Sequence, residues 1–349
     1  MAKSDGADQP GGIRGFFKRH HAKLWWIHSA YALALGALVA TFAQEGFENA
    51  RWLVLTVIAT WVLAMLVFRF FGAGNSRKLE TAGSKIRFYA MTYFLKNLYQ
   101  GMLFFLLPFY WKSATWGEPN GYFLVVLGLC AFLSTMDVIF DNFLMKWRGA
   151  SSIYYGFTLF ACLNLAIPAL LPDTGVLPSM LTAAGATVLA FWAFHFPLRL
   201  LKKPLYSGLL IVLVLSGVSG AYVARKVIPP VPLYLKSGAV GTAKLKGGRL
   251  AMELVALHKS HFTHLYATTE VVIPGGAGDS FQHVWRHERD IVHTTEGAVV
   301  LLDEGEGVLR IQTELPQESL PDNPVGQWSV DVMTTDGLLI GRVSFTVTE

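Results

Sequence analysis

The sequence has few charged residues and almost no cysteine. Only 15% of its 349 residues are charged, whereas 53% are hydrophobic, and the mean hydropathy is +0.42. Its two cysteines, Cys130 and Cys162, both lie in apolar segments, so the C-terminal part of the chain contains none and forms no disulfide. So apolar a composition excludes an ordinary soluble protein and indicates an integral membrane protein.

The sequence also lacks the short motifs of common catalytic sites. It contains no Gly-x-Ser-x-Gly, no glycine-rich phosphate loop, no His-Glu-x-x-His and no paired Cys and His. Nucleic-acid-binding motifs are missing too, and the basic residues stand in short loops beside apolar segments, where they indicate membrane anchoring. We therefore expect a protein that is not an enzyme and has no nucleic-acid partner.

Seven apolar segments follow a basic N-terminal stretch, residues 1–23, and each is near the ~20 residues that cross a bilayer. They cover residues 24–43, 52–71, 88–110, 122–141, 153–171, 179–198 and 205–224. We expect residues 24–226 to form one seven-helix transmembrane domain, an α-helical bundle. The first segment also resembles a signal peptide ending near residues 41–43, and its removal would leave the orientation of the others unchanged.

Lys and Arg gather in alternate loops between these segments. The loops before the first, third, fifth and seventh segments are basic, whereas the intervening ones contain only Arg51 and Lys112. Because cytoplasmic loops carry the excess of Lys and Arg, we expect a cytoplasmic N-terminus and a C-terminal domain on the other side. This predicts a protein of the bacterial inner membrane, in contact with the lipid bilayer, with a periplasmic C-terminal domain.

The pattern changes after residue 226. Residues 227–237 contain three prolines and predict a stiff linker, and residues 238–349 alternate apolar and polar side chains between turn signals such as Asp336-Gly337. We expect seven to nine antiparallel strands in a β-sandwich of the immunoglobulin type, with Trp328 in its core. Residues 231–349 hold 9 Lys and Arg against 15 Asp and Glu, and this net charge of −6 keeps the domain off anionic lipid.

The last strands carry a distinctive set of short runs. They are His283-Val284-Trp285, Arg310-Ile311-Gln312-Thr313, Gly326-Gln327-Trp328-Ser329-Val330-Asp331-Val332, Asp336-Gly337-Leu338-Leu339-Ile340-Gly341 and Phe345-Thr346-Val347. This set resembles a domain-of-unknown-function family of uncharacterised bacterial membrane proteins, in which helices precede a β-domain with a Gly-x-Trp-x-Val pattern. The resemblance implies fold and location, and it implies no catalytic residues.

Polar side chains inside the apolar segments form the first candidate site. They are Lys96, Asn97 and Gln100 in the third segment, Ser134, Asp137 and Asp141 in the fourth, and His195 in the sixth. A charge at bilayer depth must face another polar group or water. The set predicts either a structural pair between Lys96 and an aspartate, or a polar cavity of an ion or small-molecule transporter or channel. A membrane-embedded enzyme with a cytoplasm-facing site is a further alternative.

Histidines and aromatic residues of the C-terminal domain form the second candidate site. His258 and His264 are predicted to meet across a hairpin, while His283 and His287 share a strand face, and converging imidazoles would suit Zn²⁺ or Cu²⁺. Their spacing matches no established metal motif, so surface or packing histidines are the alternative. Tyr266 and Trp285 would serve as an aromatic platform for a ligand. The overall prediction is a periplasmic β-sandwich that binds a partner protein, a glycan or a small ligand.

Overall fold

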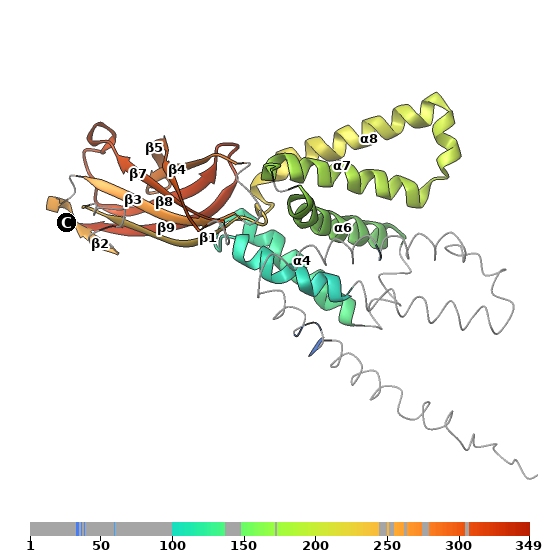
Figure 1. The fold of residues 1–349 in the computed structure, drawn as a ribbon, viewed down its shortest axis with the longest axis horizontal. Helices are drawn as coiled ribbons and strands as arrows, with labels where there is room; N and C mark the ends of the chain where they lie inside the picture. The colour runs from blue at the N-terminus through green and yellow to red at the C-terminus, as the bar shows by residue number, and fades with distance from the viewer. Residues whose placement is uncertain are drawn as a thin grey trace, which may run out of the picture.

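The computed structural model describes residues 100–136, 148–171, 173–243, 250, 255–261, 264–273, 279–303 and 307–349, and five isolated positions, 33, 34, 36, 38 and 59. Within these residues, helices occupy the first part of the chain and strands the last (Figure 1). The helices lie at one end of the long axis of the molecule and the strands at the other. The C-terminus lies at the end of the β-domain that is remote from the helices (Figure 1).

Five helices are described. Residues 100–113 are helical, and α4 (Pro119–Thr135), α6 (Arg148–Leu170), α7 (Val176–His195) and α8 (Pro204–Val223) follow, with short 3₁₀ turns at Leu198–Lys202 and Ala224–Lys226. α4 and α8 each begin at a proline, which suits the first turn because no intrahelical hydrogen bond is lost there. Three stretches are long and apolar enough to cross a membrane: Ser152–Leu170, Val176–Ala193 and Pro204–Lys226.

These three stretches correspond to the last three of the predicted apolar segments. α4 is apolar but has only 17 residues among those described. The predicted segments 24–43 and 52–71 lie outside the described residues, apart from isolated helical positions. The structure therefore shows a helical region with membrane-spanning candidates, and the count of seven stays a prediction.

Two buried tyrosines in the helical bundle bind carbonyl groups of neighbouring helices. The Tyr110 hydroxyl donates to the Ala161 carbonyl at 2.9 Å and lies 3.3 Å from the Asn164 amide, while the Tyr154 hydroxyl donates to the Cys130 carbonyl at 2.9 Å. Unpaired polar groups are costly where water is excluded, so these bonds fix the helices next to one another.

Among the described residues, nine strands form two sheets. They are β1 (Tyr234–Gly241), β2 (Ala256–His258), β3 (Leu265–Val272), β4 (Phe281–His287), β5 (Asp290–Glu296), β6 (Ala298–Asp303), β7 (Val308–Leu315), β8 (Gly326–Thr334) and β9 (Leu339–Thr348). The sheet orders are β1-β3-β7-β6 and β2-β9-β8-β4-β5. All pairs are antiparallel except β2 with β9, which is parallel, so the expectation of antiparallel strands throughout was wrong at β2.

The alternation of apolar and polar side chains along the strands produces the core between the sheets. Leu265, Ala267, Thr269 and Val271 of β3 are buried, and Trp328 of β8 is buried as predicted. One apolar cluster lies at the end remote from the helices and contains Trp285 and Trp328, whereas the other lies nearer the helices and contains Phe281 and Val332. Side chains from both sheets contribute to each cluster.

A polar layer lies along the strands between these two clusters. His283 of β4 is fully buried, with its Nε2 2.8 Å from the Thr269 hydroxyl and its Nδ1 2.8 Å from the Thr313 hydroxyl. Both threonines belong to the opposite sheet, so this single imidazole connects the two sheets by hydrogen bonds. Burial lowers the pKa of His283 from 6.5 to about 4, so the ring is neutral at pH 7.

Candidate functional site

The junction between the helices and the β-domain is held by charged side chains. Asp331 of β8 is buried between Arg286 of β4, whose Nε lies 2.7 Å away, and Arg342 of β9, whose Nη2 lies 2.9 Å away. Arg342 also donates to Glu118, in the loop before α4. Because the side chains of Arg342 and Glu118 are only 28% and 25% exposed, this pair is better shielded from water than a surface salt bridge.

Two further contacts connect the same ends of the two regions. The carboxylate of Asp279, which precedes β4, accepts the Val176 amide N–H of α7, with both oxygens at 3.1 Å. Asn120 of α4 donates to the Leu339 carbonyl of β9 at 3.3 Å. A carboxylate at a helix N-terminus satisfies a free N–H and meets the positive end of the helix dipole. The β-domain is thus fixed to the helices at both α4 and α7.

The predicted linker, residues 227–237, is part of this junction. Ile228 and Val231 are buried in the helical core, Leu233 is buried among the strands, and β1 already begins at Tyr234. The Lys112 ammonium lies 5.4 Å from the centre of the Tyr234 ring, within the range of a cation–π contact. The stretch is therefore packed between the two regions along most of its length.

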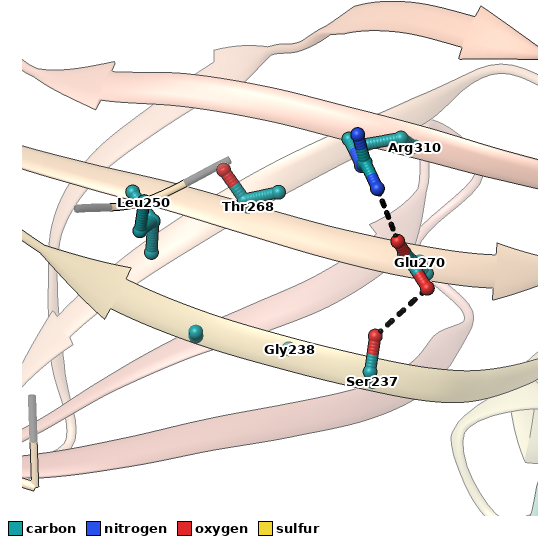
Figure 2. A pocket seen from close by; sticks show the side chains of 7 residues that line it. Ser237, Gly238, Leu250, Thr268, Glu270 and Arg310 are labelled. Carbon is teal, nitrogen blue, oxygen red and sulfur yellow. Dashed lines mark hydrogen bonds and ion pairs between the residues drawn. The ribbon is translucent and has the colours of Figure 1, made fainter. Parts of the chain in front are cut away.

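A hollow of about 350 Å³ lies on the outer face of the sheet β1-β3-β7-β6 (Figure 2). Ser237 and Gly238 of β1, Thr268 and Glu270 of β3 and Arg310 of β7 line it, with Leu250 beside them. These strand residues come together because Ser237 is the register partner of Glu270, which in turn is the partner of Arg310. The volume is at the lower end of the range for small-ligand pockets.

Charged and hydroxyl side chains line this hollow and bind one another. Arg310 donates to Glu270 at 2.6 Å, and the Ser237 hydroxyl donates to the other carboxylate oxygen at 3.1 Å, as Figure 2 shows. The hydrogen bond from Arg310 lowers the pKa of Glu270, so its carboxylate stays ionised at neutral pH. The hollow offers a fixed carboxylate, a guanidinium and hydroxyl groups, which together suit a ligand with several hydroxyl groups.

The predicted intramembrane set is only partly described. Lys96, Asn97, Asp137 and Asp141 lie outside the described residues. Gln100 is buried, and the Ser134 hydroxyl donates to the Ala131 carbonyl at 2.5 Å. His195 is exposed, with Nε2 3.0 Å from the Ser152 hydroxyl and Nδ1 2.9 Å from the Phe191 carbonyl. The transporter, channel and enzyme hypotheses therefore stay predictions.

The predicted histidine site is not assembled. Among the described residues no three His, Cys, Asp or Glu side chains come close enough to hold a metal ion. The predicted hairpin between His258 and His264 was wrong, since β2 pairs with β9 in one sheet and β3 belongs to the other. His283 is enclosed by threonines, and His287 lies 3.1 Å from the Val325 carbonyl and stacks on Trp328.

The predicted aromatic platform is also not formed. Trp285 is fully buried in the core, whereas Tyr266 lies half-buried in β3, between the core positions Leu265 and Ala267 and therefore on the outer face. A ligand cannot stack on both rings, because the body of the sheet separates them.

Sequence reasoning missed the residues of the hollow and of the junction. Glu270 and Arg310 are 40 positions apart, and Glu118 and Arg342 are 224 apart, so no local pattern connects either pair. A signal was present in the alternation of β3 and β7, which places Glu270 and Arg310 opposite the core residues. Pairing β3 with β7 in the correct register would have placed Glu270 next to Arg310.

Two family models match the chain. A family of unknown function, DUF5924, matches residues 15–257, and a second, described as a protein of unknown function, DUF2914, matches residues 279–347. The second covers the strands that carry the resemblance described from the sequence, and both confirm a relationship to domains of unknown function. A comparison with curated proteins finds no match.

Proposed function

This chain belongs to a family of unknown function, DUF5924, and we propose that it is an inner-membrane protein that presents an immunoglobulin-like β-sandwich in the periplasm for binding. The basic loops and the seven apolar segments support this orientation. In this proposal the hollow of Ser237, Glu270 and Arg310 receives a hydroxyl-rich ligand, either a small solute or a glycan. No chemical step is assigned to the protein.

The observation that carries the proposal is the attachment of the β-domain to the helices. Arg342 bonded to Glu118 and Asp279 bonded to the start of α7 hold the domain in one orientation at the ends of two helices. The hollow lies on a sheet face that these contacts leave accessible. A domain fixed in this way presents its binding face at a constant height above the bilayer.

Hydrogen exchange of the full chain in detergent micelles tests the binding. With soluble oligosaccharides as probes, we expect slower exchange in peptides of β1, β3 and β7. Glu270→Gln or Arg310→Gln should abolish that protection, because each removes one charge of the hollow.

The matched control is Glu314→Gln, which changes an exposed carboxylate on β7 that does not line the hollow. This variant should keep the protection. If the protection persists in both Glu270→Gln and Arg310→Gln, or if no oligosaccharide protects these strands, the hollow is not the binding site.

A further inference from the structure

The strand β6 is an edge strand with apolar side chains on both faces. Val299 and Leu301 are opposite Ile311 and Leu309 of β7, which are buried, so they belong to the core face, whereas Val300 is opposite Arg310 on the outer face. All four side chains from Val299 to Leu302 are nevertheless 42–52% exposed. A strand that is apolar on both faces is typical of the interior of a sheet.

This edge has little of the protection that exposed edges normally carry. Charged side chains, proline or bulges usually prevent another strand from pairing there. In β6 only Asp303 and the irregular pairing before it provide this, at the end nearest the helices. The opposite side of the domain is closed differently, since a Cβ on Gly341 of β9 would lie 2.6 Å from Leu235 of β1, so the two sheets approach closely there.

Among the described residues no strand pairs with the outer edge of β6, and a polypeptide strand is the partner that can bond to all the backbone N–H and C=O groups of that edge. Lipid tails cannot satisfy backbone N–H and C=O groups. A second copy of this chain does not fit either. β6 runs toward the helices, because its last residue pairs with Val308, next to Leu309, which belongs to the same apolar cluster as Val176 of α7. Two copies inserted in the same direction therefore cannot pair antiparallel through β6.

Parallel pairing of two copies also fails. A two-fold axis along the membrane normal would place the same residue of each β6 at the same height, whereas a parallel ladder needs the two strands staggered by one residue. Because pairing of β6 with β6 of a second copy is excluded, we take the partner strand to come from a different protein.

Charge indicates the chemistry of that partner. Exposed Glu296 comes just before β6, and residues 231–349 hold 15 Asp and Glu against 9 Lys and Arg. An apolar strip beside a carboxylate in an acidic domain matches a segment whose apolar residues are flanked by Lys or Arg. Val300 is also the register partner of Arg310, so an added strand would extend the face that holds the hollow.

We propose that β6 is a docking edge for an extended, apolar segment of a partner protein, flanked by basic residues, which adds a strand to the sheet β1-β3-β7-β6. The proposal rests on the proposed function only for the compartment in which the partner is found. Binding by the edge itself is independent of that compartment and of the hollow.

Fluorescence anisotropy with the full chain in micelles and in lipid nanodiscs tests this. The probe is a labelled peptide of alternating valine and threonine between paired lysines. We expect saturable binding that weakens at least about tenfold when alternate backbone amides are N-methylated or the lysines are replaced by glutamate. Val300→Lys should weaken binding as much. Val255→Lys, the same change at an exposed valine beside β2 on the far edge of the other sheet, should not.

Three results would overturn the proposal. Binding that is insensitive to N-methylation or to Val300→Lys would place the peptide elsewhere. Concentration-dependent dimerisation abolished by Val300→Lys would make a second copy the occupant. Binding in micelles that is lost in nanodiscs would mean that the bilayer covers the edge. The oligosaccharide test measures binding at the hollow, whereas the peptide test measures binding at the β6 edge. Either proposal can therefore be refuted without the other.

Discussion

Acid should weaken the β-domain through His283. Burial lowers its pKa from 6.5 to about 4, so the unfolded chain binds a proton between these values and the folded chain does not. The stability that the neutral ring contributes is fully present above pH 6.5 and is lost as the pH falls toward 4. The complete difference corresponds to about 3 kcal/mol, of which about 2 kcal/mol is lost by pH 5 and about 1 kcal/mol by pH 6.

The geometry explains why protonation is costly at this position. The ring has no exposed surface, and each nitrogen already has a threonine hydroxyl at 2.8 Å. A neutral imidazole needs one donor and one acceptor, which two hydroxyls supply. A charged ring would remain without solvent and would force both hydroxyls to act as acceptors.

Hydrogen exchange of core amides in β4 and β8, corrected for the intrinsic rate at each pH, gives the opening free energy of the domain. The wild-type value should fall by about 2 kcal/mol from pH 7.5 to pH 5. His283→Gln replaces the titrating ring by a neutral amide, so its value should fall much less, whatever its stability at pH 7.5. His264→Gln, at an exposed histidine, should keep the wild-type dependence. An unchanged pH dependence in His283→Gln would refute the reasoning.

Four further variants test the junction and one turn. Arg342→Gln should lower the free energy of unfolding by about 2 kcal/mol and speed hydrogen exchange at the start of β9. Arg286→Gln should leave exchange there unchanged, because Arg286 does not reach the helices. Equal exchange at the start of β9 in the two variants would contradict this. Asp279→Ala should cost about 1 kcal/mol by thermal unfolding, since the Val176 N–H at the start of α7 loses its acceptor. Gly337→Ala should cost about 1 kcal/mol, because the turn holds φ at +85 and no atom lies near the added methyl group; an unchanged midpoint would show the turn relaxes.

Local periodicity was enough to predict the core of the β-domain. The alternation in β3 placed Leu265 and Val271 on the buried face, and the turn at Asp336-Gly337 was predicted from its residues. The burial of His283 was also available from the alternation, because it shares a face with Trp285. We interpreted His283 as a potential metal ligand, whereas the face that it shares with Trp285 indicates packing in the core.

Long-range pairing was beyond the local pattern. β2 has three residues and too little alternation to select a partner, so its parallel pairing with β9 could not be predicted. The ion pair of Glu270 with Arg310 depends on strand register, and the contact of Arg342 with Glu118 depends on how the two regions dock. Both are set by tertiary packing.

The central claim is that the β-domain and the loop before α8 lie on opposite sides of the membrane. The two native cysteines are buried, so a single introduced cysteine can be labelled selectively. In spheroplasts, an impermeant maleimide should label Glu318→Cys, at an exposed position of the β-domain, without lysis, and should label Lys202→Cys only after lysis. Labelling of Lys202→Cys in intact spheroplasts, with Glu318→Cys protected, would contradict the account.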